Sequence, residues 1–168
     1  MASKSKKREV VSVFVDNQAN VLTRVVSLFG RRGFNIDSLT VSATNDPGLS
    51  RITVVFDSTE QSLAQIIAQT EKLENVRDIF ALDPDESLFR ELLLVKVETG
   101  KEERSAIREI ADIYRAKIID LSKTSMIMEL TGEPAKIDGF MNMIDCYNIV
   151  EVCRTGITAM ERGWVEKE

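Results

Sequence analysis

The alternation of apolar and polar positions predicts one βαββαβ unit in the first half of the chain. Four segments alternate with a period of two, as strands do: residues 9–15, 34–43, 51–57 and 76–82. Two segments repeat apolar residues every three or four positions, as helices do: Val21, Leu22, Val25, Val26, Leu28 and Phe29, then Leu63, Ile66, Ile67, Thr70 and Leu73. The apolar phase slips between Ile36 and Leu39, which indicates a bulge near Asp37 and Ser38.

The second half of the chain repeats this order. Its predicted strands are residues 92–97, 117–121, 126–130 and 149–153. Its predicted helix stripes are Ile107, Ile110, Ala111 and Tyr114, then Ile137, Phe140, Met141 and Ile144. The sequence therefore predicts an α+β fold of two ferredoxin-like βαββαβ sandwiches, each with two helices on one face of an antiparallel sheet. We expect two copies to pair through uncovered edges and faces.

The segment Asp83-Pro84-Asp85-Glu86-Ser87 interrupts the pattern and divides the chain. We therefore predict a first domain at 8–82, a linker at 83–89, a second domain at 90–160, and flexible tails at 1–7 and 161–168. The basic start of the chain lacks the apolar run of a signal peptide, and no window is long enough to span a membrane. It suits a solvated tail or a contact arm for an acidic partner.

Composition argues against several kinds of active site. The 168 residues carry a net charge of −5 and include no histidine, which removes the usual general base and the commonest metal ligand. Cys146 and Cys153 match neither a disulfide framework nor a zinc pattern, so we expect reduced thiols, a cytoplasmic protein, and Cys153 in the core. Met126 and Met128 are expected in the sheet core. We find no catalytic constellation and no metal site, which favours a binding protein over an enzyme.

One turn has the chemistry to bind an amino acid. The first N–H groups of a helix lack internal partners and favour a carboxylate, and here they belong to Asn20, Val21 and Leu22. Side-chain carbonyls of Asn17 and Asn35 would accept from an ammonium group. An aliphatic side chain would lie against Val21, Leu22 and Ile36. The alternative is simple capping of the helix by Asn17 or Asn20, with Asn35 in a turn before a strand.

A second alternative is an RNA-binding module on the same topology. The run Gly30-Arg31-Arg32-Gly33 resembles the loop of KH domains, and Arg32-Gly33-Phe34 resembles the opening of an RRM sheet motif. However, a KH loop needs helices on both sides, and the third strand offers only Phe56 as an aromatic. Arginine and glycine also suit an ordinary helix end. The negative net charge opposes a nucleic-acid partner.

Longer motifs carry a more specific resemblance, which covers nearly all of residues 8 to 160. They lie at residues 16–25, 28–41, 46–51, 90–97, 117–120 and 149–157, and include Arg31-Arg32-Gly33-Phe34-Asn35-Ile36 and Asp46-Pro47-Gly48-Leu49-Ser50-Arg51. Together they resemble the regulatory (small) subunit of acetohydroxyacid synthase, also called acetolactate synthase.

This resemblance implies a function in branched-chain amino acid biosynthesis. The first domain would be an ACT domain that dimerises side by side and binds an inhibitory branched-chain amino acid, most often valine, between protomers. One protomer would offer Asn17, Asn20, Val21 and Leu22, and the other would offer Asn35 and Ile36. The chain would hold no cofactor itself. It would bind and activate a catalytic large subunit carrying thiamine diphosphate, magnesium and FAD.

The chain departs from the family at one important position. The family usually has glycine where this chain has Asn20. Glycine adopts positive φ and lets a ligand approach the backbone closely, and asparagine is the side chain that best imitates the first property. Gln18 and Ala19 also replace residues that are often Glu-Pro, which predicts a less rigid turn.

Overall fold

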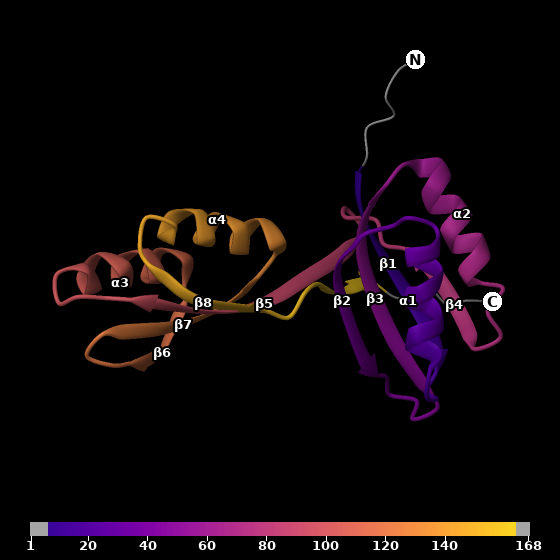
Figure 1. The fold of residues 1–168 in the computed structure, drawn as a ribbon, viewed down its shortest axis with the longest axis horizontal. Helices are drawn as coiled ribbons and strands as arrows, with labels where there is room; N and C mark the ends of the chain where they lie inside the picture. The colour runs from indigo at the N-terminus through magenta and orange to yellow at the C-terminus, as the bar shows by residue number, and fades with distance from the viewer. Residues whose placement is uncertain (1–6, 164–168) are drawn as a thin grey trace, which may run out of the picture. The chain divides into compact units, whose positions relative to one another are not determined.

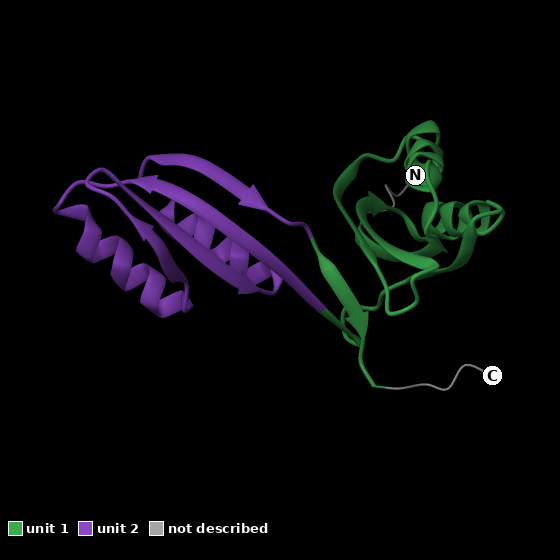
Figure 2. Ribbon diagram, turned by 90° about the horizontal axis from the view of Figure 1, so that it is seen from below, with its two compact units in different colours: residues 1–88, 157–168 green, residues 89–156 purple. Residues whose placement is uncertain are grey.

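The computed structural model describes residues 7–163 of the chain. The chain forms two compact units (Figure 2). Among the described residues, the first unit comprises 7–88 together with 157–163. The second unit runs from Phe89 to Gly156. The first unit is therefore discontinuous in sequence.

The first unit has the predicted βαββαβ order. Its elements are β1 (Lys7–Asp16), α1 (Val21–Arg31), β2 (Ile36–Ala43), β3 (Leu49–Ser58), α2 (Glu60–Thr70) and β4 (Val76–Ala81). The antiparallel sheet has the order β2-β3-β1-β4, and both helices cover one of its faces (Figure 1). Phe29, Ile52 and Phe56 are fully buried in the core between them. The register of β2 on β3 shifts between Ile36 and Ser38, which confirms the predicted bulge.

The second unit repeats the arrangement, so the predicted pair of ferredoxin-like sandwiches is confirmed. Its elements are β5 (Ser87–Glu98), α3 (Glu103–Tyr114), β6 (Lys117–Leu121), β7 (Ser125–Gly132), α4 (Pro134–Ile144) and β8 (Ile149–Arg154). The sheet order is β6-β7-β5-β8, with α3 and α4 on one face (Figure 1). Met126 and Met128 are 2% and 0% exposed, which confirms their place in the core.

A further strand, β9 (Thr158–Glu161), departs from the predicted boundaries. It pairs with β5 and belongs to the first unit, although residues 90–160 were expected to form the second domain. The expected linker at 83–89 overlaps β5 at its end, and the expected tails overlap β1 at Lys7 and β9 at Glu161. The rest of those tails, 1–6 and 164–168, lies outside the described residues.

Burial explains why the chain returns to the first unit. Ile157 and Ala159 are 3% and 4% exposed, and Thr40 Oγ1 donates a hydrogen bond of 3.1 Å to the carbonyl of Ile157. Val10 and Val55, on the sheet face opposite α1 and α2, are also buried. The segment from Ile157 therefore covers part of this face within one chain, whereas Phe14 and Phe80, which stack on the same face, remain partly exposed.

The expectation of a buried Cys153 is also wrong. Cys153 and Cys146 are both exposed free thiols. Cys153 pairs with Leu94, whose neighbours Leu93 and Val95 are in the core, so Cys153 lies on the sheet face opposite α3 and α4. In addition, β8 is at one edge of its sheet, where every residue after Ile149 remains exposed. An edge strand has a neighbour on one side only, so strand pattern alone does not establish burial.

Candidate functional site

The amino end of α1 is open. Asn20 precedes the helix with φ 69° and ψ −3°, a left-handed conformation, and its side chain makes no capping hydrogen bond. The first turn contains no acidic residue. Within the described chain, no side chain accepts a hydrogen bond from the N–H of Val21, Leu22 or Thr23. The capping alternative is therefore wrong, and these donors are available to a ligand.

Asn17 is fixed beside this helix end by the turn between β2 and β3. Its backbone N–H donates to the carbonyl of Gly48 at 2.8 Å, and its Nδ2 donates to the carbonyl of Pro47 at 3.2 Å. Both bonds use donors of Asn17. Its side-chain carbonyl is thus left as an acceptor, which is the role predicted for it.

Asn35 and Ile36 lie at the other end of α1. Ile36 pairs with Phe56 of β3, which in turn pairs with Glu9 near the start of β1, whereas Asn17 follows the end of β1. Eleven helical residues separate the two groups by about 16 Å along the axis. One chain therefore does not assemble the six predicted residues into one site.

The predicted apolar wall is only partly available. Val21 is 4% exposed and packs into the core of the first unit, so only its N–H can face a ligand. Leu22 is 37% exposed beside the open helix end. Ile36 is half-buried against the core, and Asn35 Nδ2 donates to Asp37 Oδ1 at 3.4 Å in a turn before β2.

A polar network supports the turn before α1, and the sequence reasoning missed it. The Asp16 carboxylate accepts from Arg77 Nε at 2.5 Å and from Arg77 Nη2 at 2.7 Å. Asn75 Nδ2 donates to Asp16 Oδ2 at 3.3 Å, while Asn75 Oδ1 accepts from Arg24 Nη1 at 2.9 Å. The hydrogen bonds from Arg77 lower the pKa of Asp16, so this carboxylate stays ionised at neutral pH. Nothing in the local sequence around Asp16 signals partners so far along the chain.

The described residues contain neither a cluster of three or more metal-ligating side chains nor a helix long and apolar enough to cross a membrane. This end of the first unit offers groups that suit the binding of a small polar ligand. It combines backbone donors at a helix terminus, amide acceptors and a small apolar surface.

The left-handed conformation of Asn20 gives a testable expectation. We expect Asn20→Val to lower the free energy of unfolding by about 1–2 kcal/mol, because a β-branched residue is strained at positive φ. Asn20→Gly should leave the stability within about 0.5 kcal/mol of the original chain. Urea denaturation measures both. Thr23→Val, at an exposed position of α1, is the matched control. Equal stability of the two valine variants would contradict this account.

The chain resembles known proteins across both units. The family described as "AHAS small subunit-like ACT domain" matches residues 11–78, and "Small subunit of acetolactate synthase" matches residues 90–163. The acetolactate synthase small subunit of Mycolicibacterium smegmatis is 40% identical over 153 residues, which is 91% of this chain and 90% of the relative. The probable acetolactate synthase small subunit of Archaeoglobus fulgidus is 40% identical over 93% of this chain and 98% of its own.

A solved structure has the same fold over the same extent. The crystal structure of the acetolactate synthase small subunit from Thermotoga maritima matches with a TM-score of 0.86 and 37% identity. The match covers 95% of this chain and 99% of that one. The sequence matches and the structural match thus both extend over the two units of the chain.

Proposed function

The chain belongs to the family of small regulatory subunits of acetolactate synthase, and from this premise we infer that it is a non-catalytic subunit that activates a catalytic large subunit. It also makes that subunit responsive to a branched-chain amino acid, with valine as the first candidate. The setting is branched-chain amino acid biosynthesis in the cytoplasm. Thiamine diphosphate, magnesium and FAD belong to the large subunit in this proposal, and this chain holds no cofactor.

The open amino end of α1 is the observation that carries the effector proposal. An amino acid carboxylate would accept from the N–H groups of Val21 and Leu22, where the helix dipole also favours negative charge. The amide carbonyl of Asn17 would accept from the ammonium group. The exposed side chain of Leu22 would contact a branched aliphatic side chain. Each group of the effector then meets a complementary group of the protein.

A dimer through the ACT domain completes the site in this proposal. Asn35 and Ile36 of one copy would face Asn17, Asn20, Val21 and Leu22 of the other, because one chain holds the two groups at opposite ends of α1. β2 is an edge strand of its sheet and begins at Ile36. Edge strands pair readily with a second copy, so β2 supplies both a dimer contact and part of the site.

Two asparagine substitutions test the effector site. We expect Asn17→Ala and Asn35→Ala to weaken valine inhibition of the assembled enzyme by about 5- to 150-fold, since each removes one hydrogen bond worth about 1–3 kcal/mol. Activation of the large subunit should persist. The measurement is acetolactate formation with and without the small subunit, over a range of L-valine concentrations.

Asn142→Ala is the matched control, because it makes the same change at an exposed position of α4 in the second unit. It should leave valine inhibition unchanged. Variants at Asn17 and Asn35 that lose activation but retain inhibition would overturn this division of roles. Calorimetric titration with L-valine, L-leucine and L-isoleucine then identifies the effector, with saturation near one site per protomer expected.

A further inference from the structure

Asp16 precedes the open amino end of α1 and carries the same negative charge as the ligand carboxylate proposed to bind there. It lies five positions before Val21, and Asn75 connects its carboxylate to Arg24 in the first turns of α1 through bonds of 3.3 and 2.9 Å. Aspartate is among the side chains that best cap a helix amino terminus. A free Asp16 carboxylate would therefore compete with an anionic ligand for the same donors and would repel it.

Arg77 prevents this competition by its geometry. Its Nε and Nη2 engage both oxygens of Asp16, an arrangement that fixes the direction of a carboxylate as well as its charge. The side chain of Asp16 is only 13% exposed, whereas that of Arg77 is 58% exposed. Asn75 reinforces the arrangement, because its carbonyl accepts from the backbone N–H of Asp16 at 2.9 Å. The carboxylate is thereby held in place by groups outside α1.

We propose that Arg77 is a positioning residue of the effector site. Its positive charge balances that of the ionised Asp16 carboxylate, and its two hydrogen bonds keep this carboxylate turned away from the amino end of α1. The inference rests on the proposed function, since it assumes that an amino acid carboxylate binds at this helix end. The inference adds that effector binding also depends on a residue of β4, the edge strand that contains Arg77. Arg77 acts through Asp16 and makes no contact with the ligand itself.

A purely structural role for Arg77 makes a different prediction. If Arg77 only held β4 against the turn before α1, loss of Arg77 or of Asp16 would weaken ligand binding. Loss of both residues would then weaken it to the same extent. If Arg77 restrains a competing charge, removing that charge restores binding. Replacing Asp16 in the Arg77→Ala background therefore separates the two roles.

The test is calorimetric titration of L-valine into the full chain and its variants. We expect Arg77→Ala to weaken binding about tenfold, and Arg77→Ala combined with Asp16→Ala, which removes both the charge and the capping acceptor, to recover to within about threefold of the original affinity. Arg108→Ala is the control, because it removes an exposed arginine beside Asp112 in the second unit. It should bind valine normally. Thermal denaturation of each variant verifies that it is folded.

The outcomes separate this inference from the proposed function. If the original chain binds L-valine and Arg77→Ala binds it equally well, or if the double variant binds as weakly as Arg77→Ala, the role of Arg77 is overturned and the effector site stands. If the original chain binds none of L-valine, L-leucine and L-isoleucine, alone or with the large subunit, the effector site and the role of Arg77 fall together.

Discussion

Replacing Phe29 with alanine is expected to lower the free energy of unfolding of the first unit by about 3–5 kcal/mol. Phe29 is fully buried, and its ring centroid lies 5.2 Å from that of Phe56 and 6.1 Å from that of Phe34. Phe34 and Phe56 are themselves 5.1 Å apart in an edge-to-face pair. Truncation leaves a cavity among three aromatic rings, and rigid rings close such a space poorly.

Urea denaturation followed by circular dichroism measures this loss. Ile113→Ala is the control, because Ile113 is 72% exposed on α3 and its truncation should change stability by less than about 0.5 kcal/mol. A destabilisation of Phe29→Ala below about 1 kcal/mol would contradict the packing described here. The large subunit should be activated poorly by this variant at temperatures where the first unit is partly unfolded.

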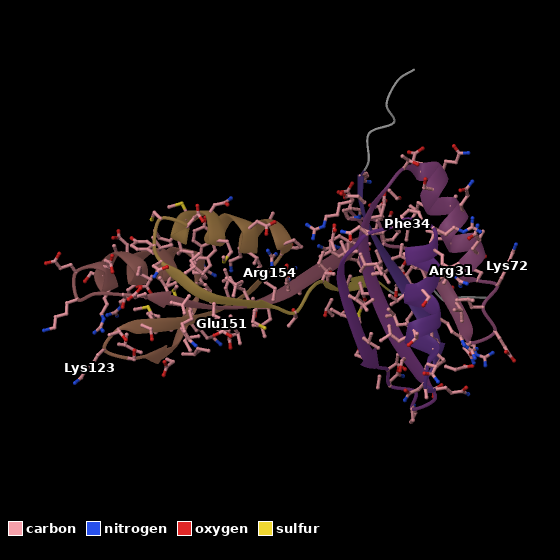
Figure 3. All side chains as sticks on the ribbon, viewed as in Figure 1. Arg31, Phe34, Lys72, Lys123, Glu151 and Arg154 are labelled. Carbon is pink, nitrogen blue, oxygen red and sulfur yellow. The ribbon has the colours of Figure 1, made fainter. Side chains whose placement is uncertain are left out.

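Arg154→Ala is the second variant with a large expected effect. Figure 3 labels Arg154 among the side chains of the second unit. The side chain of Glu91 is only 5% exposed and accepts from Arg154 Nε at 2.8 Å and from Nη2 at 2.7 Å, while Arg154 Nη1 donates to Asp138 at 2.9 Å. Hydrogen bonding to Glu91 raises the pKa of Arg154. Removing the guanidinium leaves a buried carboxylate without its cation, and we expect a loss of about 3 kcal/mol in the second unit.

A double variant distinguishes an unpaired charge from a general loss of packing. Glu91→Leu combined with Arg154→Leu should recover most of the stability, because apolar residues of similar volume often replace a buried ion pair at little cost. Thermal denaturation of Glu91→Leu, Arg154→Leu and the double variant, compared with the original chain, forms a cycle that isolates the pair. A double variant no more stable than Arg154→Ala would show that the guanidinium contributes mainly through packing.

Local periodicity was enough to predict most of the fold. The helices and the first eight strands each repeat their apolar residues over enough positions to distinguish helix from strand. The slip in the apolar phase between Ile36 and Leu39 predicted the bulge in β2. β9 was not predicted, because its four residues contain only two periods of apolar and polar alternation. The exposure of Cys153 was not predicted because it depends on the pairing of β8 with β5 and on the order of strands in the sheet, which are long-range properties.

At the candidate site as well, features set by neighbouring residues could be predicted, and contacts between residues far apart in the sequence could not. The left-handed conformation of Asn20 agrees with the prediction that asparagine imitates the positive φ of a glycine at this position. The apolar pattern of the helix placed the Val21 side chain in the core, whereas the site hypothesis placed it against a ligand. The structure buries this side chain in the core. Arg77 lies 61 positions from Asp16, and no motif links them. Only the pairing of β4 with β1 brings these residues together.

The discontinuity of the first unit limits how this protein can be divided. Two chain segments join the units, one through β5 and one through Gly156, so a single proteolytic nick in either segment leaves both halves tethered. An exchange of gene segments that transferred residues 8–82 alone would leave behind Ile157 and Ala159, which are buried in the first unit. A transfer that keeps these buried contacts must therefore include both connections between the units, which means the chain from β1 to β9.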